Sequence, residues 1–193
     1  MSDTANGGGG ETGGAFEMAL EVVVIPVSDV DRAQRFYADL GWRLDLDFDS
    51  GDGYRVIQFT PPGSACSVIF GAMVTTAAPG SLRALHLVVA DICKAYVELV
   101  RRGVDVCGPF HDPAGVFHRV GQQGHVPGAN PQRKSYASYL SFTDPDGNQW
   151  VVQEITARLG PDLTESDNRF TPEVVYAAMH PAHPDAGDPG LRG

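Results

Sequence analysis

The chain has 193 residues and a formal net charge of −10, from 14 basic and 24 acidic residues. Apolar residues make up 42% of it, enough for a hydrophobic core in one domain or two small modules. The acidic balance argues against nucleic acid or an anionic membrane as a partner, because both would repel this surface. No apolar run approaches the roughly 20 residues of a membrane span. The scattered cysteines, Cys66, Cys93 and Cys107, form no disulfide framework and indicate a reducing cytoplasm.

The two ends of the chain differ from its middle. Residues 1–14 are glycine-rich and polar, lack the basic and apolar stretches of a signal peptide, and are expected to be disordered. Residues 158–193 form a C-terminal extension rich in proline, aspartate and glycine. Within it, the run 171–173 (Thr-Pro-Glu) predicts the start of one short tail helix.

The middle of the chain opens with a strand and a helix. Apolar, β-branched residues at 20–27 predict a buried strand. Asp29 is suited to cap the following helix, and Gly41 is suited to end it. One helical face is apolar and comprises Val30, Ala33, Phe36, Tyr37 and Leu40. Three more predicted strands follow, at 42–48, 54–60 and 66–71.

The same pattern then returns. A strand at 85–89 precedes Asp91 and Gly103, which have the spacing of Asp29 and Gly41. The second helix has an apolar face made of Ile92, Ala95, Tyr96, Leu99 and Val100. Three strands follow again, at 104–110, 138–143 and 150–155. We therefore expect an α+β fold of two strand–helix–strand–strand–strand (βαβββ) modules, residues 16–80 and 81–157.

The second copy differs by a long connection at 111–135, which we interpret as an ordered lid because a loop of this length in a compact domain commonly serves function. His111, His118 and His125 are spaced too widely for a helix-borne metal pair, and each is expected to be solvated unless it reaches a ligand. His118, beside an aromatic residue, is the best candidate to contact one. Arg133 could hold a ligand carboxylate or phosphate, although a solvated loop base is the simpler interpretation.

Three segments carry a family resemblance: VSDVDRAQRFYADLGW (27–42), LHLVVADI (85–92) and SFTDPDGNQWVVQE (141–154). They resemble the vicinal oxygen chelate superfamily, which includes glyoxalase I, extradiol dioxygenases, and the bleomycin and fosfomycin resistance proteins. The resemblance implies that the two modules form a curled sheet cup around a small ligand. It also implies that many members hold a divalent metal there, with His and Glu ligands, as a Lewis acid.

The residues at the family's usual metal positions are unusual in this chain. Counted from the capping Asp of each copy, the positions that commonly carry His are Val22 and Ala84. Counted from the turn glycine before each last strand, the positions that commonly carry Glu are Ser67 and Val151. The resemblance therefore implies that the usual metal centre is not retained, although a divalent metal on shifted ligands stays possible.

Several other residues are candidates for the site. His86 is predicted to point into the cup as a catalytic acid/base or as a surviving ligand; the alternative is an interior His with satisfied hydrogen bonds. Glu154 is a weak metal candidate together with His86, because alternation places it on the opposite sheet face. Gln58, Tyr139 and Gln153 could orient a ligand by hydrogen bonds, or could be polar residues of a wet interior.

Three functions remain open at this point. The first is an enzyme of lyase, isomerase or dioxygenase type that acts on an oxygen-bearing organic compound without the usual metal ligands. The second is a non-catalytic protein that sequesters a small molecule, as in the bleomycin-resistance branch; the acidic surface would favour a cationic ligand. The third is a metal enzyme with shifted ligands. A small-molecule ligand is the expected partner, and a homodimer is possible.

Overall fold

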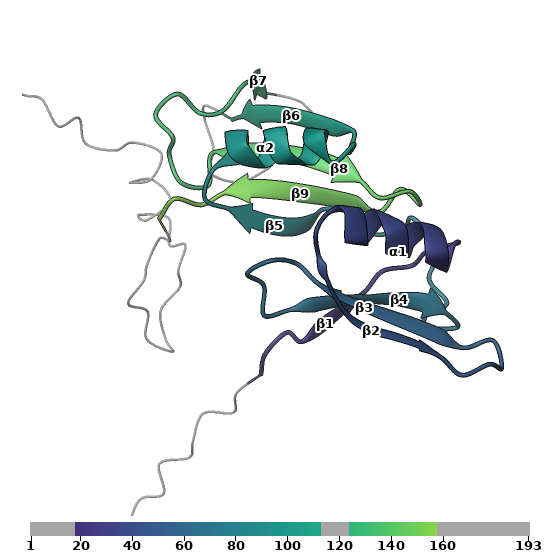
Figure 1. Cartoon of the computed structure of the whole chain (residues 1–193). Coiled ribbons are helices and arrows are strands. Elements are labelled where there is room, and N and C mark those ends of the chain that lie inside the picture. Colours follow the sequence, from purple (N-terminus) through teal and green to yellow (C-terminus); the bar gives the residue numbers. More distant parts are fainter. Residues whose placement is uncertain (1–17, 113–123, 158–193) are drawn as a thin grey trace, which may run out of the picture.

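The computed structural model describes residues 18–112 and 124–157 (Figure 1). The first module contains β1 (Val22–Val24), α1 (Val30–Asp39), β2 (Arg43–Asp49), β3 (Arg55–Thr60) and β4 (Ser67–Ala72). The second contains β5 (Leu85–Val89), α2 (Ile92–Arg101), β6 (Val106–His111), β7 (Val126–Pro127), β8 (Ser138–Thr143) and β9 (Gln149–Glu154). Below, module 1 is residues 22–72 and module 2 is residues 85–154.

The two modules have the same strand order. Sheet A has the order β1-β4-β3-β2, and sheet B has the order β5-β9-β8-β6-β7, in which β7 is an addition. In each module the first strand pairs in parallel with the last one, and the remaining pairs are antiparallel. The predicted α+β class and the βαβββ order of both copies are confirmed.

Both helices begin where their sequences predict. The Asp29 carboxylate accepts a hydrogen bond from the backbone N–H of Arg32, and the Asp91 carboxylate accepts from Cys93 and Lys94. The apolar face of α1 lies in the core as predicted. On α2, Val100 differs from the prediction: it is 47% exposed, while the rest of its predicted face packs inward.

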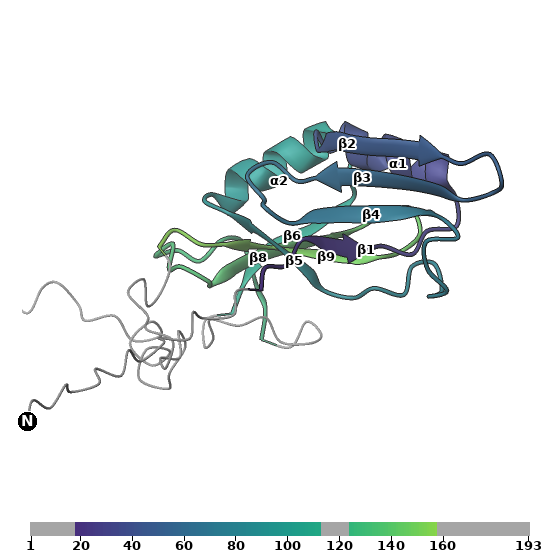
Figure 2. The same cartoon turned by 90° about the horizontal axis from the view of Figure 1, so that it is seen from below.

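Most of the space between the two sheets is filled by α1 and by aromatic side chains. Tyr37 of α1 packs on Phe70 of sheet A at 5.4 Å between ring centroids and on Trp150 of sheet B at 6.3 Å. Trp42 meets Trp150 edge-on at 5.2 Å. One buried cluster therefore spans both modules, and α1 lies between the sheets (Figure 1). Seen from below, the strands of sheet A lie in front of α1 (Figure 2).

This arrangement changes where a ligand can lie. We expected the two sheets of one chain to face each other across a shared hollow. Instead, the helix-bearing faces meet, because they carry the large apolar residues that gain most from burial. The opposite face of each sheet, called its open face below, points away from this core. Any cup on an open face is therefore not closed by the other sheet of the same chain.

The turn between β8 and β9 ties module 2 to the start of module 1. Asp146 accepts hydrogen bonds from the backbone and hydroxyl of Ser28 and forms an ion pair with Arg32 at 2.9 Å. The side-chain amide of Asn148 donates to the carbonyl of Pro26 at 2.9 Å. The Asp-Pro-Asp-Gly-Asn turn that carries the family resemblance is therefore an inter-module contact.

A buried hydrogen-bond network continues from this turn into the core. The Tyr37 hydroxyl donates to Asp144 at 2.9 Å, and the indole N–H of Trp150 donates to the Tyr37 oxygen at 3.3 Å. The Asn148 amide donates to the same Asp144 carboxylate at 2.8 Å. Burial and the nearby Asp144 charge raise the pKa of Tyr37, so its hydroxyl stays protonated and keeps donating.

Candidate functional site

The open face of sheet B collects most of the predicted site residues. His86 of β5 pairs with Val151 of β9, and Tyr139 of β8 pairs with Gln153 of β9. These four residues share one parity, and the alternate residues, such as Phe142, belong to the core. The predicted common face of His86, Tyr139 and Gln153 therefore follows from the strand register. Sequence alternation was sufficient to find it.

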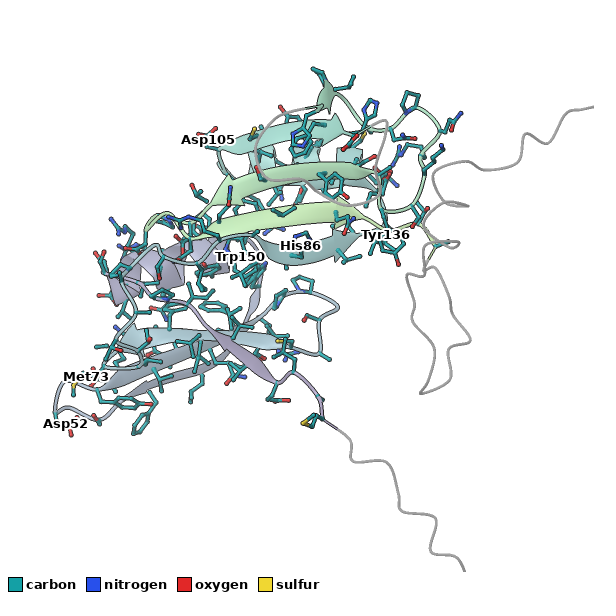
Figure 3. The ribbon with its side chains drawn as sticks, turned by 180° about the vertical axis from the view of Figure 1, so that it is seen from behind. Asp52, Met73, His86, Asp105, Tyr136 and Trp150 are labelled. Carbon is teal, nitrogen blue, oxygen red and sulfur yellow. The ribbon has the colours of Figure 1, made fainter. Side chains whose placement is uncertain are left out.

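His86 also lines a cavity at the seam between the modules. The cavity has a volume of about 240 Å³ and lies where β1 and the start of β4 approach β5. Its apolar walls come from both modules and include Val23, Val68, Leu85, Leu87 and Trp150. Figure 3 shows His86 and Trp150 close together on this side of the molecule. We call it the seam cavity.

The His86 ring has no hydrogen-bond partner within residues 18–112 and 124–157. Burial lowers the pKa of His86 below its ordinary value of 6.5, so the ring is neutral at pH 7. A neutral imidazole has one donor and one acceptor nitrogen, and both can serve a ligand.

Tyr139 and Gln153 are already joined to each other. The Gln153 amide donates to the Tyr139 oxygen and to the carbonyl of Tyr136, each at 3.0 Å. Both side chains are buried, and burial raises the pKa of Tyr139, which keeps its hydroxyl neutral. This pair is a fixed polar element on the same sheet face as His86.

Aromatic rings continue this face toward the connection at 111–135. Phe110 of β6 stacks on His125 at 4.3 Å between centroids and lies 6.0 Å from Tyr139 in a near-parallel orientation. His111, expected to be solvated, is instead only 7% exposed, and its Nδ1 lies 2.9 Å from the Gly128 carbonyl oxygen. The pairing of β7 with β6 covers this ring, which the sequence of the connection did not reveal. His118 lies outside the described residues.

Glu154 is placed away from this face. Its register partner is Val89, so it points to the helix side of sheet B, where it is fully buried. Its carboxylate accepts hydrogen bonds from the backbone N–H of Ile92 and from Arg133. His86 and Glu154 are therefore not brought together, and Arg133 is engaged in a structural ion pair instead of facing a ligand.

The strand register also corrects one of the positions counted from the sequence. In module 1, Val22 pairs with Ser67; in module 2, the partner of Val151 is His86, not Ala84. The count fails because the segment between β1 and α1 is longer than that between β5 and α2. Within 18–112 and 124–157, no three His, Cys, Asp or Glu side chains are grouped as a metal site.

The open face of sheet A holds Gln58 and a hydrogen-bonded chain that the sequence did not predict. Gln58 pairs with Ile69 and Leu46, two residues along β3 from Thr60, and it does not line the seam cavity. Next to the cavity, the Thr60 hydroxyl donates to Asp45 and lies 2.7 Å from the Ser67 hydroxyl. Asp45 reaches Thr60 because the register of β2 shifts between residues 44 and 46. The sequence pattern did not predict this bulge.

Comparison with known proteins identifies the class. The chain matches the Glyoxalase/Bleomycin resistance protein/Dioxygenase superfamily over residues 19–152, and it belongs to this superfamily. The predicted family is thereby confirmed.

Solved structures of similar proteins include two from Streptomyces sp. CB03234. TnmS3, an antibiotic binding protein, is 28% identical, with a TM-score of 0.54 over 72% of this chain and 97% of that one. A glyoxalase/bleomycin resistance protein is 29% identical, with a TM-score of 0.51 over 70% of this chain and 100% of that one. A superfamily member from Sphaerobacter thermophilus DSM 20745 shares the fold at 24% identity, with a TM-score of 0.52 over 72% and 98%.

One comparison with known proteins and one search of the structure itself give negative results. No curated protein shows significant similarity to the sequence. In the described part of the chain, none of the helices has the length and apolar character needed to cross a membrane.

Proposed function

We propose that this protein binds and sequesters a small organic molecule, held in the seam cavity and on the adjoining open face of sheet B. The observation that carries the proposal is the His86 ring, which lines a largely apolar cavity with both nitrogens unengaged among the described residues. Ligand sites of this kind combine apolar walls with a few well-placed polar groups. The similarity to an antibiotic binding protein supports binding as the function.

The site has the parts that binding requires. Leu85, Leu87 and Trp150 offer apolar area, and the Tyr139–Gln153 pair adds fixed polar groups along the same face as His86. Because that pair is hydrogen-bonded already, little conformational entropy is lost there when a ligand arrives. A cavity of about 240 Å³ suits a one- or two-ring compound or one end of a larger ligand.

Calorimetric titration of the full chain with indole tests this proposal, because indole is a neutral two-ring probe of suitable size. One saturable site per chain is expected. Leu87→Trp fills the cavity and should abolish the binding. Val97→Trp is the matched control, because Val97 is 64% exposed on α2, away from the cavity, and this variant should bind normally. Absence of saturable heat, or unchanged binding by Leu87→Trp, would refute the proposal.

An enzymatic role is the second candidate, favoured by the neutral state of His86. A neutral imidazole at pH 7 can accept a proton from a bound compound as a general base. Sequestration predicts that a bound compound is recovered chemically unchanged after prolonged incubation, as judged by mass spectrometry. Recovery of an altered compound, lost in His86→Ala, would replace sequestration by catalysis.

We further propose that a second copy of the chain covers the open face of sheet A. Leu46 and Phe48 on this face are 43% and 50% exposed, which is unusual for neighbouring large apolar residues. Sedimentation should show a dimer that Phe48→Asp converts to monomer, whereas Asp52→Ala, in the exposed β2–β3 turn, should not. A monomeric wild-type chain would exclude this proposal.

We also propose a cytoplasmic location, on the basis of three cysteines that form no disulfide.

A further inference from the structure

The wall of the seam cavity contributed by module 1 has a hydrogen-bond polarity that can be derived atom by atom. Ser67, 5% exposed, lines the cavity at the first position of β4. Its hydroxyl is the last group of a chain that runs from Asp45 through Thr60. The direction of that chain decides what Ser67 can offer to a ligand.

The chain begins at a group that only accepts. Hydrogen bonds from Arg43 and from Thr60 hold the pKa of Asp45 below its ordinary value of 3.8. Asp45 is therefore a carboxylate at neutral pH, and a carboxylate has no proton to donate. Consequently the Thr60 hydroxyl donates its single proton to Asp45.

The second link then has only one possible direction. The Thr60 and Ser67 oxygens are 2.7 Å apart, so one of the two hydroxyls must supply a proton. The Thr60 proton is already used at Asp45, so Ser67 donates to Thr60. The Ser67 oxygen thus keeps lone pairs but has no remaining proton for a ligand.

We infer that the seam cavity selects a small, largely apolar molecule that donates a hydrogen bond, through an N–H or O–H group, to the Ser67 oxygen. In a molecule of the same shape with an acceptor atom at that point, the lone pair of the acceptor would lie against a lone pair of the Ser67 oxygen, and the two would repel each other. The inference rests on the proposed binding function and adds the chemical class of the ligand. Val68, Leu85 and Trp150 supply the apolar surroundings in which one hydrogen bond discriminates strongly.

The opposite wall does not remove this selectivity. His86 is neutral, and either of its nitrogens can carry the proton, so it adapts to a donor or to an acceptor. Ser67 is fixed by its partners, whereas His86 is not. Ser67 therefore requires a hydrogen-bond donor on the ligand, whereas His86 can bind either a donor or an acceptor.

Indole and benzofuran test the inference, because they have nearly the same shape and differ in an N–H donor against a ring oxygen acceptor. In calorimetric titrations of the full chain, indole should bind about tenfold more tightly than benzofuran, the effect of one hydrogen bond in a site of this kind. Ser67→Ala should weaken indole about tenfold and should not weaken benzofuran, which loses only an unfavourable contact between lone pairs. Ser50→Ala is the matched control, because Ser50 is exposed in the β2–β3 turn and does not line the cavity, and it should alter neither affinity.

Thr60→Val tests whether selectivity depends on the direction of the Ser67 hydroxyl proton or only on the presence of Ser67. Without the Thr60 oxygen, the Ser67 hydroxyl can turn its proton toward the ligand. Benzofuran should then bind nearly as well as indole, although Ser67 is still present. An unchanged ratio of the two affinities in Thr60→Val would overturn the assigned direction.

The remaining outcomes distinguish the two proposals. If wild type binds both compounds equally and Ser67→Ala changes neither affinity, the selectivity is wrong while the binding cavity stands. If wild type binds neither compound, the proposed function at this cavity is wrong, and the inference is lost with it.

Discussion

Modules 1 and 2 share one βαβββ backbone but have different types of side chain at equivalent strand positions. Beside the seam cavity, module 1 places Val22 on its first strand and Ser67 on its last strand, whereas module 2 places His86 on the first and Val151 on the last. Each module thus keeps one polar and one aliphatic residue, but on opposite strands. The cavity between them has a hydroxyl acceptor on one wall and an imidazole on the other.

Polar residues before the last strand of each module have different tasks. Thr60 fixes the direction of the Ser67 hydroxyl, and Asp144 binds Tyr37 in the core between the modules. The polar group of module 1 therefore serves the cavity, and that of module 2 serves the joint between the modules. The variants that follow break these asymmetries one at a time.

The largest effect is expected at the joint. Asp144→Ala leaves the buried Tyr37 hydroxyl and Asn148 amide without their acceptor, and should lower the free energy of unfolding by about 3 kcal/mol. Asp49→Ala is the control on an exposed strand end and should cost less than about 0.5 kcal/mol. Urea unfolding monitored by circular dichroism gives both values. Equal stability of the two variants would mean that the joint contributes nothing.

A smaller effect is expected where module 2 buries a charge. Glu154 occupies the position that Phe70 has in module 1, and Arg133 pairs with it. Arg133→Met should lower the free energy of unfolding by about 2 kcal/mol, because a fully buried carboxylate loses its partner while Arg133 itself is partly exposed. Adding Glu154→Gln should recover part of the loss. A double variant no more stable than Arg133→Met would show that the unpaired charge was not the cause.

The smallest effect concerns the pH dependence of stability. The pKa of His86 is lower in the folded chain than its ordinary 6.5, so the unfolded chain binds the proton more readily. Stability contributed by this group is complete above pH 6.5 and falls as the pH is lowered through the folded pKa. The loss should stay below about 0.5 kcal/mol, because solvent screens the exposed part of the ring.

His86→Val, which installs the module 1 residue, isolates this contribution from those of the other histidines. Urea unfolding from about pH 8 to about pH 5 should show a shallower decline for the variant than for wild type. Parallel curves would show that His86 titrates alike in the folded and unfolded chain.

Periodicity and repeat spacing predicted the fold, because β-branched strands, Asp caps and terminal glycines are local signals. The strands at 85–89 and 138–143 have their predicted bounds. The common face of His86, Tyr139 and Gln153 also followed from alternation. The direction in which the modules pack did not, because either face of a sheet can meet a partner. The Asp45–Thr60–Ser67 chain depends on a bulge and on contacts between three strands, which no local pattern encodes.

A ligand bound between the modules can be detected directly by intermolecular nuclear Overhauser effects from bound indole. Cross-peaks should connect indole protons with the methyl groups of both Val23 and Leu87, which line the seam cavity from module 1 and module 2. Saturable binding with cross-peaks to neither residue, for example only to Val97 on α2, would contradict the account.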